Sequence, residues 1–270
     1  MRFLFLIFIF LACSSPKSVS RNLSSDYTAE KIFISHPSDK NKKIEFFIDS
    51  HVKKQKLKTI VFIHGHQFPK RLGGYDVVKW GVLDKWKKRG FNAVSISQPG
   101  YGESDGPADY CGMFTQDAVI AVLDYLDKNS ISDREDITLI GVSRGAMVSG
   151  MVASRKIIKN LVLIAGAYDL GALYHNLSYS PIKRNIAKEA GTESWQFRER
   201  SVLSHAEKIN SRVLILHGKR DRAPTYQNAK DLFSLLKVSG NEVELNGFDS
   251  GHRIPIGERK KLIDKFIIGN

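Results

Sequence analysis

The sequence has 270 residues, 42% of them hydrophobic, and its 41 Lys and Arg residues outnumber the 28 Asp and Glu residues. This length suits one α/β domain with a full core, and the ordinary hydrophobic fraction excludes a wholly disordered chain. The formal charge of +13 comes from short basic runs without a basic-aromatic motif, so we predict a solvated basic surface and no nucleic-acid partner.

The first residues have the composition of an export signal. Arg2 is followed by an unbroken apolar run that is too short to span a bilayer comfortably. The run ends in FLAC, residues 10–13, which resembles the lipobox of bacterial lipoproteins with phenylalanine in place of the usual leucine. The resemblance implies a signal peptide over 1–12, a lipid on Cys13, a flexible tether over 13–29 and an exported, membrane-anchored protein. An ordinary cleaved signal peptide is the alternative.

Strand and helix patterns alternate through residues 30–270, the predicted domain. We expect an antiparallel pair of strands first, followed by buried Val/Ile/Leu strands with helices between them, which is typical of a parallel sheet covered on both faces. A stretch rich in aromatic and polar residues interrupts this pattern at about 169–200, and it predicts an inserted helical cap or a long loop. The expected strands are 31–36, 43–50, 58–65, 91–98, 137–143, 160–168, 212–218 and 241–248, and the expected helices are 75–90, 114–129, 144–156, 225–240 and 258–269.

Two segments fit the pattern Gly-x-Ser-x-Gly that is typical of a nucleophilic serine on a sharp turn. In GVSRG, residues 141–145, Ser143 follows a clean buried strand and leads directly into a helix whose first residues are small. In GESDG, residues 102–106, Ser104 is separated from its strand by Pro99 and Gly100, and Pro107 prevents an immediate helix. The context favours Ser143 as the nucleophile and a turn role for Ser104.

A nucleophilic serine needs a general base and an acid that orients the base. In α/β-hydrolases the chain order is Ser, then Asp or Glu, then His, and Asp221 and His252 follow two successive predicted strands in that order. We predict Asp221 as the acid and His252 as the base, with Asp249 as the reserve acid. The other histidines lie in the cap, in connecting segments or at strand ends, where a supporting role is more common.

The developing oxyanion needs two N–H donors. One is expected from the amide of Arg144, directly after the nucleophile, and the second from the amide of His66 in the loop after strand 58–65, with Gln67 in reserve. The alternative for His64-Gly65-His66 is a metal site, for which two histidines are weak evidence. We predict that the reaction requires no cofactor and no metal.

With GVSRG, HGH, HGKRD and SGH placed, the chain from about residue 30 resembles an α/β-hydrolase. Its C-terminal half is similar to the catalytic domain of the prolyl oligopeptidase and acylaminoacyl-peptidase family, and GYGESDGP is similar to a loop that many such hydrolases carry. The sequence departs from the family pattern at Ala146, where a second glycine is usual, and it has no room for a β-propeller. The resemblance implies this fold and triad and leaves the substrate open.

We therefore predict a serine hydrolase, most simply an esterase-like lipoprotein acting on a small ester, amide or short peptide. The alternatives are a peptidase of prolyl-oligopeptidase type, an acyltransferase or thioesterase, and a binding lipoprotein that kept the fold without catalysis. Four arginines adjoin predicted site residues, and if two faced the pocket they would favour an anionic substrate. The simpler expectation is that most of them point to solvent: Arg144, Arg220, Arg222 and Arg253.

Overall fold

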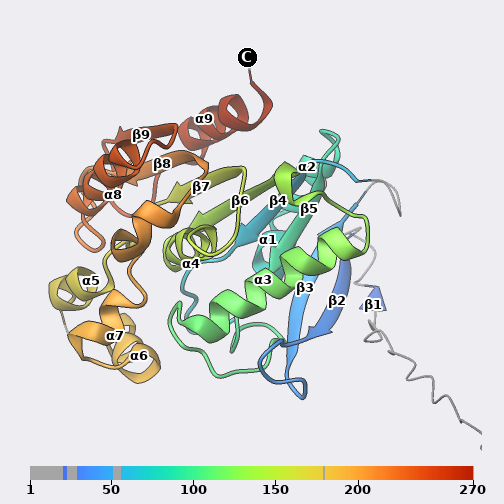
Figure 1. Ribbon diagram of the computed structural model, residues 1–270, viewed down its shortest axis with the longest axis horizontal. Coiled ribbons are helices and arrows are strands. Elements are labelled where there is room, and N and C mark those ends of the chain that lie inside the picture. Colours follow the sequence, from blue (N-terminus) through green and yellow to red (C-terminus); the bar gives the residue numbers. More distant parts are fainter. Residues whose placement is uncertain (1–20, 23–28, 51–55, 179, 270) are drawn as a thin grey trace, which may run out of the picture.

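A computed structural model describes residues 21–22, 29–50, 56–178 and 180–269. The predicted signal peptide and Cys13 lie outside the described residues. The described chain forms a nine-stranded sheet in the order β1-β2-β3-β5-β4-β6-β7-β8-β9 (Figure 1). The strands are β1 (Arg21–Asn22), β2 (Glu30–Ser35), β3 (Lys43–Asp49), β4 (Thr59–Ile63), β5 (Asn92–Ile96), β6 (Ile137–Val142), β7 (Asn160–Ile164), β8 (Arg212–Gly218) and β9 (Val243–Phe248).

Neighbouring strands are parallel through the series β5-β4-β6-β7-β8-β9. The remaining strands, β1, β2 and β3, form an antiparallel edge that joins β5. Helices cover both of its faces, and α3 and α4 lie in front of it in Figure 1. This confirms the predicted α/β class with a mostly parallel central sheet. The helices are α1 (Tyr75–Lys79), α2 (Val82–Lys87), α3 (Met113–Lys128), α4 (Arg144–Ala153), α5 (Leu170–Asn176), α6 (Pro181–Ala190), α7 (Ser194–Arg198), α8 (Tyr226–Val238) and α9 (Ile256–Ile268), with 3₁₀ turns η1 (Arg134–Asp136) and η2 (Val202–Lys208).

Alternate side chains of each parallel strand enter different cores. On β7, Leu161 and Leu163 pack with α3, α4 and α8, whereas Val162 and Ile164 belong to the core of α1, α2 and α9. Successive side chains of a strand point to opposite faces, so a strand with helices on both sides must be apolar throughout. Among the described residues, no helix is both long enough and apolar enough to cross a membrane.

One predicted helix, residues 75–90, is wrong because the chain forms two short helices there. α1 ends before Trp80, and Gly81 adopts a left-handed φ of 62° before α2 begins. Glycine occupies this region of φ/ψ space without steric cost, so it allows the chain to turn within a segment whose apolar spacing fits one helix.

The segment predicted as an inserted cap or a long loop contains the three helices α5, α6 and α7. Figure 1 shows them grouped together outside the sheet. Their starts carry capping contacts: the side chain of Asp169 accepts from the Ala172 N–H, and that of Ser180 accepts from the Lys183 N–H. Such contacts satisfy first-turn N–H groups that have no partner within the helix.

Candidate active site

Ser143 occupies the turn between β6 and α4, with φ 54° and ψ −119°. A positive φ is unfavourable for a residue that has a Cβ, so contacts around the turn must hold it in place. The Ser143 N–H donates to the carbonyl of Ile164 on β7 over 2.8 Å, and α4 begins at Arg144. The hydroxyl therefore lies on a strained strand-to-helix turn, which is the geometry of a nucleophile elbow.

Two glycines allow the close packing of this elbow. A Cβ on Gly141 would lie 2.3 Å from the carbonyl oxygen of Gly145, and a Cβ on Gly145 would lie 2.1 Å from that of Ile63 on β4. Side-chain atoms do not approach backbone atoms this closely in well-packed proteins. The glycines of GVSRG are thus required by packing, in addition to leaving Ser143 accessible.

Asp221 and His252 follow β8 and β9, which are neighbours in the sheet. His252 Nδ1 lies 2.7 Å from Asp221 Oδ2, and His252 Nε2 lies 3.0 Å from Ser143 Oγ. Asp221 is 7% exposed, whereas the side chain of His252 is 43% exposed. The structure thus joins the three predicted residues, hereafter the triad, in one hydrogen-bonded chain that solvent can reach.

Asp221 is held by contacts besides the one to His252. Its Oδ1 accepts from the Ala223 N–H over 3.2 Å, and the buried Nε2 of His217 lies 3.5 Å from its Oδ2. Nε2 of His217 also lies 3.2 Å from the carbonyl oxygen of Pro224; a carbonyl only accepts, so this nitrogen carries a proton. Burial lowers the pKa of His217, which keeps the imidazole neutral beside the carboxylate.

The alternative residues lie away from this chain. Ser104 is buried beneath its loop, where its Oγ accepts from the Glu45 N–H over 2.8 Å and donates to the carbonyl of Ser97 over 2.7 Å. Asp249, the reserve acid, is exposed and forms an ion pair of 3.3 Å with Arg220. Ser104 thus connects its loop to β3 and to the residue that follows β5, and Asp249 makes its contact on the surface.

The loop that follows β4 runs beside the elbow. A Cβ on Gly65 would lie 3.3 Å from Cβ of Ser143, so His66 is one residue away from a glycine that packs against the nucleophile. The side chain of Gln67 accepts from the Gly73 N–H over 2.7 Å and donates to the Gly73 carbonyl over 3.1 Å, which closes the loop. The other predicted donor, the Arg144 amide, is in the first turn of α4, where N–H groups have no partner within the helix.

Most of the four flanking arginines point to solvent as predicted, and the buried side chain of Arg144 is the exception. The residue is 3% exposed, and its Nη1 donates to Glu189 Oε2 over 2.9 Å and to Tyr101 Oη over 3.1 Å. Its Nε donates to Gln98 Oε1 over 3.1 Å. A buried guanidinium needs a counter-ion, and Glu189 supplies it. The other three flanking arginines are exposed: Arg220, Arg222 and Arg253.

Sequence reasoning missed these three partners of Arg144. Gln98 and Tyr101 follow β5, and Glu189 belongs to α6. One signal existed for Glu189, the single acidic residue in the α6 sequence PIKRNIAKEA. Another existed for Tyr101, which stands in the loop already noted as GYGESDGP.

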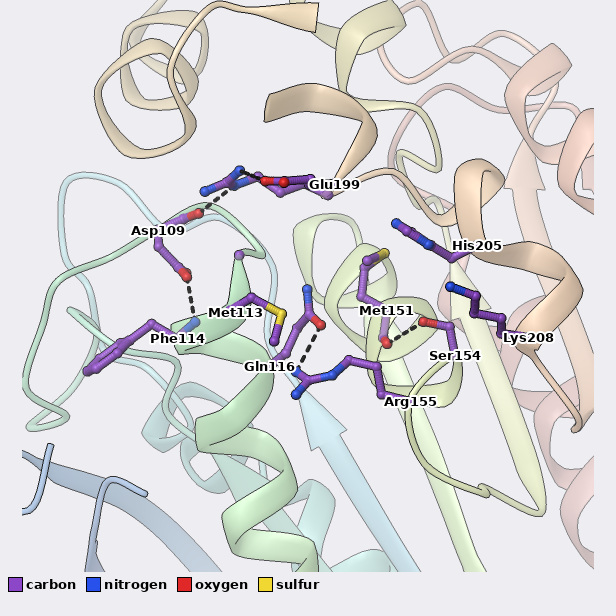
Figure 2. A pocket seen from close by; sticks show the side chains of 12 residues that line it. Asp109, Met113, Phe114, Gln116, Met151, Ser154, Arg155, Glu199, His205 and Lys208 are labelled. Carbon is purple, nitrogen blue, oxygen red and sulfur yellow. Dashed lines mark hydrogen bonds and ion pairs between the residues drawn. The ribbon is translucent and has the colours of Figure 1, made fainter. Parts of the chain in front are cut away.

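A hollow of about 530 Å³ lies at the other end of α4 from Ser143 (Figure 2). Residues from the start of α3, the end of α4 and η2 line it, and none of the triad residues is among them. His205 and Lys208 extend from η2 toward Met151 in Figure 2. His205, excluded as the base by its position in the sequence, therefore lines a different surface from the triad.

Comparisons with known proteins agree with this geometry. A family model described as the prolyl oligopeptidase family matches residues 110–267, more than half of the chain. A curated relative, acylamino-acid-releasing enzyme 2 of Oryza sativa subsp. japonica, is 24% identical over 218 residues, which is 73% of this chain and 28% of the relative. The chain spans little more than a quarter of that relative's length.

Solved structures share the fold at low identity. An esterase of Pyrococcus furiosus superposes with a TM-score of 0.70 at 20% identity, covering 94% of this chain and 96% of that one. An acylaminoacyl peptidase of Pyrococcus horikoshii has a TM-score of 0.70 at 18% identity, covering 91% of this chain and 42% of that one. The chain belongs to the prolyl oligopeptidase family and has the α/β-hydrolase fold.

Proposed function

We propose that Ser143, His252 and Asp221 form the catalytic triad of an esterase-like enzyme that acts through an acyl-enzyme. The observation that carries the proposal is the continuous chain of hydrogen bonds, 3.0 Å from Ser143 Oγ to His252 Nε2 and 2.7 Å from His252 Nδ1 to Asp221 Oδ2. The first distance is within the reach that proton transfer from serine to imidazole requires, and the second lets the carboxylate orient the imidazole.

In the proposed reaction, His252 accepts the proton of Ser143 while Oγ attacks the substrate carbonyl. The buried carboxylate of Asp221 holds the imidazole in one tautomer and stabilises the imidazolium, and the amides of Arg144 and His66 receive the oxyanion. His252 then protonates the leaving group, which departs and leaves the acyl group on Oγ. Water, deprotonated by His252, attacks the acyl-enzyme, and the collapse of this second intermediate returns the proton to Ser143.

Esterases among the matched structures support an ester as the proposed substrate. The esterase of Pyrococcus furiosus is covered over 96% of its length, whereas the acylaminoacyl peptidase is covered over only 42%. Peptidase action on short peptides, suggested by the family, is the second candidate.

Labelling with a fluorophosphonate tests the proposed nucleophile. The probe reacts with activated serines, and we expect peptide mass spectrometry of the labelled protein to find the phosphonate on Ser143 and not on Ser104. A folded protein that is unlabelled, or labelled at Ser104, would contradict the assignment. Hydrolysis of p-nitrophenyl esters beside short peptidyl anilides then distinguishes the two candidate functions.

We also propose that Cys13 anchors the enzyme to a membrane through a lipid. The support is the apolar run that ends in FLAC, together with the basic charge of the chain, which favours an anionic membrane surface. When the full gene is expressed in a bacterium, we expect the protein in the membrane fraction, and Cys13→Ala should release it or block its processing. An unchanged distribution and an unchanged mass of the N-terminal peptide would contradict lipidation.

A further inference from the structure

A buried group of polar side chains connects the cap, the elbow and the loop after β4. We call it the Arg144 cluster, and it consists of Arg144, Glu189, Tyr101, Gln98 and His66. Its members come from separate parts of the chain, yet each lies within hydrogen-bond distance of another member. Two of them, Arg144 and His66, are the residues whose amides are the proposed oxyanion donors.

Glu189 fixes one end of the cluster. The side chains of Arg144 and Glu189 are 1% and 6% exposed, and Arg144 Nη1 lies 2.9 Å from Glu189 Oε2. The other carboxylate oxygen is 3.8 Å from Nη2 of Arg71, a residue of the loop after β4. Buried ion pairs with fixed hydrogen bonds constrain geometry strongly, because neither charge can leave its partner without a large desolvation cost.

Two links run from the guanidinium of Arg144 to the loop after β4. In the first, Arg144 Nε donates to Gln98 Oε1 over 3.1 Å, and Gln98 Nε2 donates to the carbonyl of His64 over 2.6 Å. In the second, Arg144 Nη1 donates to Tyr101 Oη over 3.1 Å, and Tyr101 Oη lies 3.2 Å from Nδ1 of His66. The loop is thus held from the elbow side at His64 and at His66.

Both imidazoles of this loop are neutral at ordinary pH. Burial, with the nearby charge of Arg144, lowers the pKa of His64 and the pKa of His66 to about 4. The Nε2 of His64 accepts from the Gln98 N–H over 3.1 Å, which a protonated ring could not do. The hydrogen bonds of both links therefore keep the same donors and acceptors across the pH range in which a serine hydrolase works.

We propose that the Arg144 side chain is a positioning group that sets the spacing of the oxyanion donors at Arg144 and His66, with Tyr101 as the link and Glu189 as the anchor from the cap. The inference rests on the proposed function. Oxyanion donors act by being held in place before charge develops, so that no energy is spent on reorganisation during the reaction. A guanidinium that touches no substrate can therefore affect the rate through the two amides.

Tyr101→Phe removes the link and keeps the aromatic ring. The guanidinium carbons of Arg71 and Arg144 lie 4.8 and 5.2 Å from the centroid of this ring. With p-nitrophenyl butyrate and the full chain, we expect kcat to fall about tenfold to a hundredfold with KM nearly unchanged. Removing an oxyanion donor outright costs about 10²–10³ in kcat, and a loosened donor should cost less. The control is Tyr168→Phe, which also removes a fully buried hydroxyl and should alter kcat less than twofold.

A transition-state readout separates positioning from simple loss of stability. Butaneboronic acid forms a tetrahedral adduct with an activated serine, and its inhibition constant should weaken in Tyr101→Phe by about the same factor as kcat/KM. His66→Leu breaks the same link at its other end, so the double variant with Tyr101→Phe should lose little more than the more impaired single variant. Independent sites would instead give multiplied losses.

The outcomes distinguish this inference from the proposed function. A wild-type protein that neither reacts with the fluorophosphonate nor hydrolyses the ester contradicts the proposed function, and this inference with it. An active wild type beside Tyr101→Phe with unchanged kcat, or with losses that multiply in the double variant, contradicts the inference alone. A rise in KM without a change in kcat would also overturn it, by placing Tyr101 in ground-state binding.

Discussion

Asp221→Asn is expected to lower kcat about 10⁴-fold while KM changes little. The carboxylate of Asp221 lies 2.7 Å from His252 Nδ1, and it favours the tautomer that leaves Nε2 free to accept the proton of Ser143. An asparagine of the same shape can donate to Nδ1 and stabilise the wrong tautomer, and in serine proteases this change costs about 10⁴ in kcat. Steady-state hydrolysis of p-nitrophenyl butyrate measures the effect.

Asp249→Asn is the matched control for this prediction. Asp249 lies three residues before His252, but its carboxylate is 83% exposed and pairs with Arg220. Exposed ion pairs contribute little, so kcat should stay within about twofold of wild type. If Asp249→Asn caused the large loss and Asp221→Asn did not, the acid of the triad would be Asp249.

The meeting of the three residues of the proposed triad could be predicted from sequence because each of them follows a recognisable strand. Ser143, Asp221 and His252 stand just after β6, β8 and β9, and strands of a parallel sheet bring their carboxyl ends to one edge. The order of the three residues along the chain and the glycines around Ser143 were therefore enough to predict that they meet. Local pattern and topology together determined this part of the site.

The Arg144 cluster could not be predicted in the same way. Arg144 and Glu189 are 45 residues apart, and their pairing depends on how α6 packs against the elbow. A basic residue in a basic chain is most often exposed, so the sequence favoured solvent for a side chain that is in fact buried. The break at Gly81 was missed for a related reason. The helical spacing of apolar residues continues across Gly81, whereas the helical backbone conformation is interrupted there.

Gly145→Ala is expected to destabilise the fold by about 4 kcal/mol or to prevent the recovery of folded protein. The added Cβ would lie 2.1 Å from the carbonyl oxygen of Ile63 and 2.6 Å from that of His64. Both are backbone atoms, so relief requires α4 to move away from β4, and losses above about 4 kcal/mol arise from such packing conflicts. Urea unfolding followed by circular dichroism measures the change.

Gly257→Ala provides the control, because Gly257 is likewise the second residue of its helix, α9. Apart from its chain neighbours and the adjacent backbone of α9, no heavy atom of the described chain would lie within 4 Å of a Cβ there. Alanine favours helix over glycine by up to about 1 kcal/mol, so the urea midpoint should stay the same or rise. Equal losses of stability in the two variants would show that alanine at the second position of a helix is itself destabilising, and that the contact with β4 is not the cause. A loss confined to Gly145→Ala would show that this contact, beside the loop that carries His66, holds the elbow against the sheet.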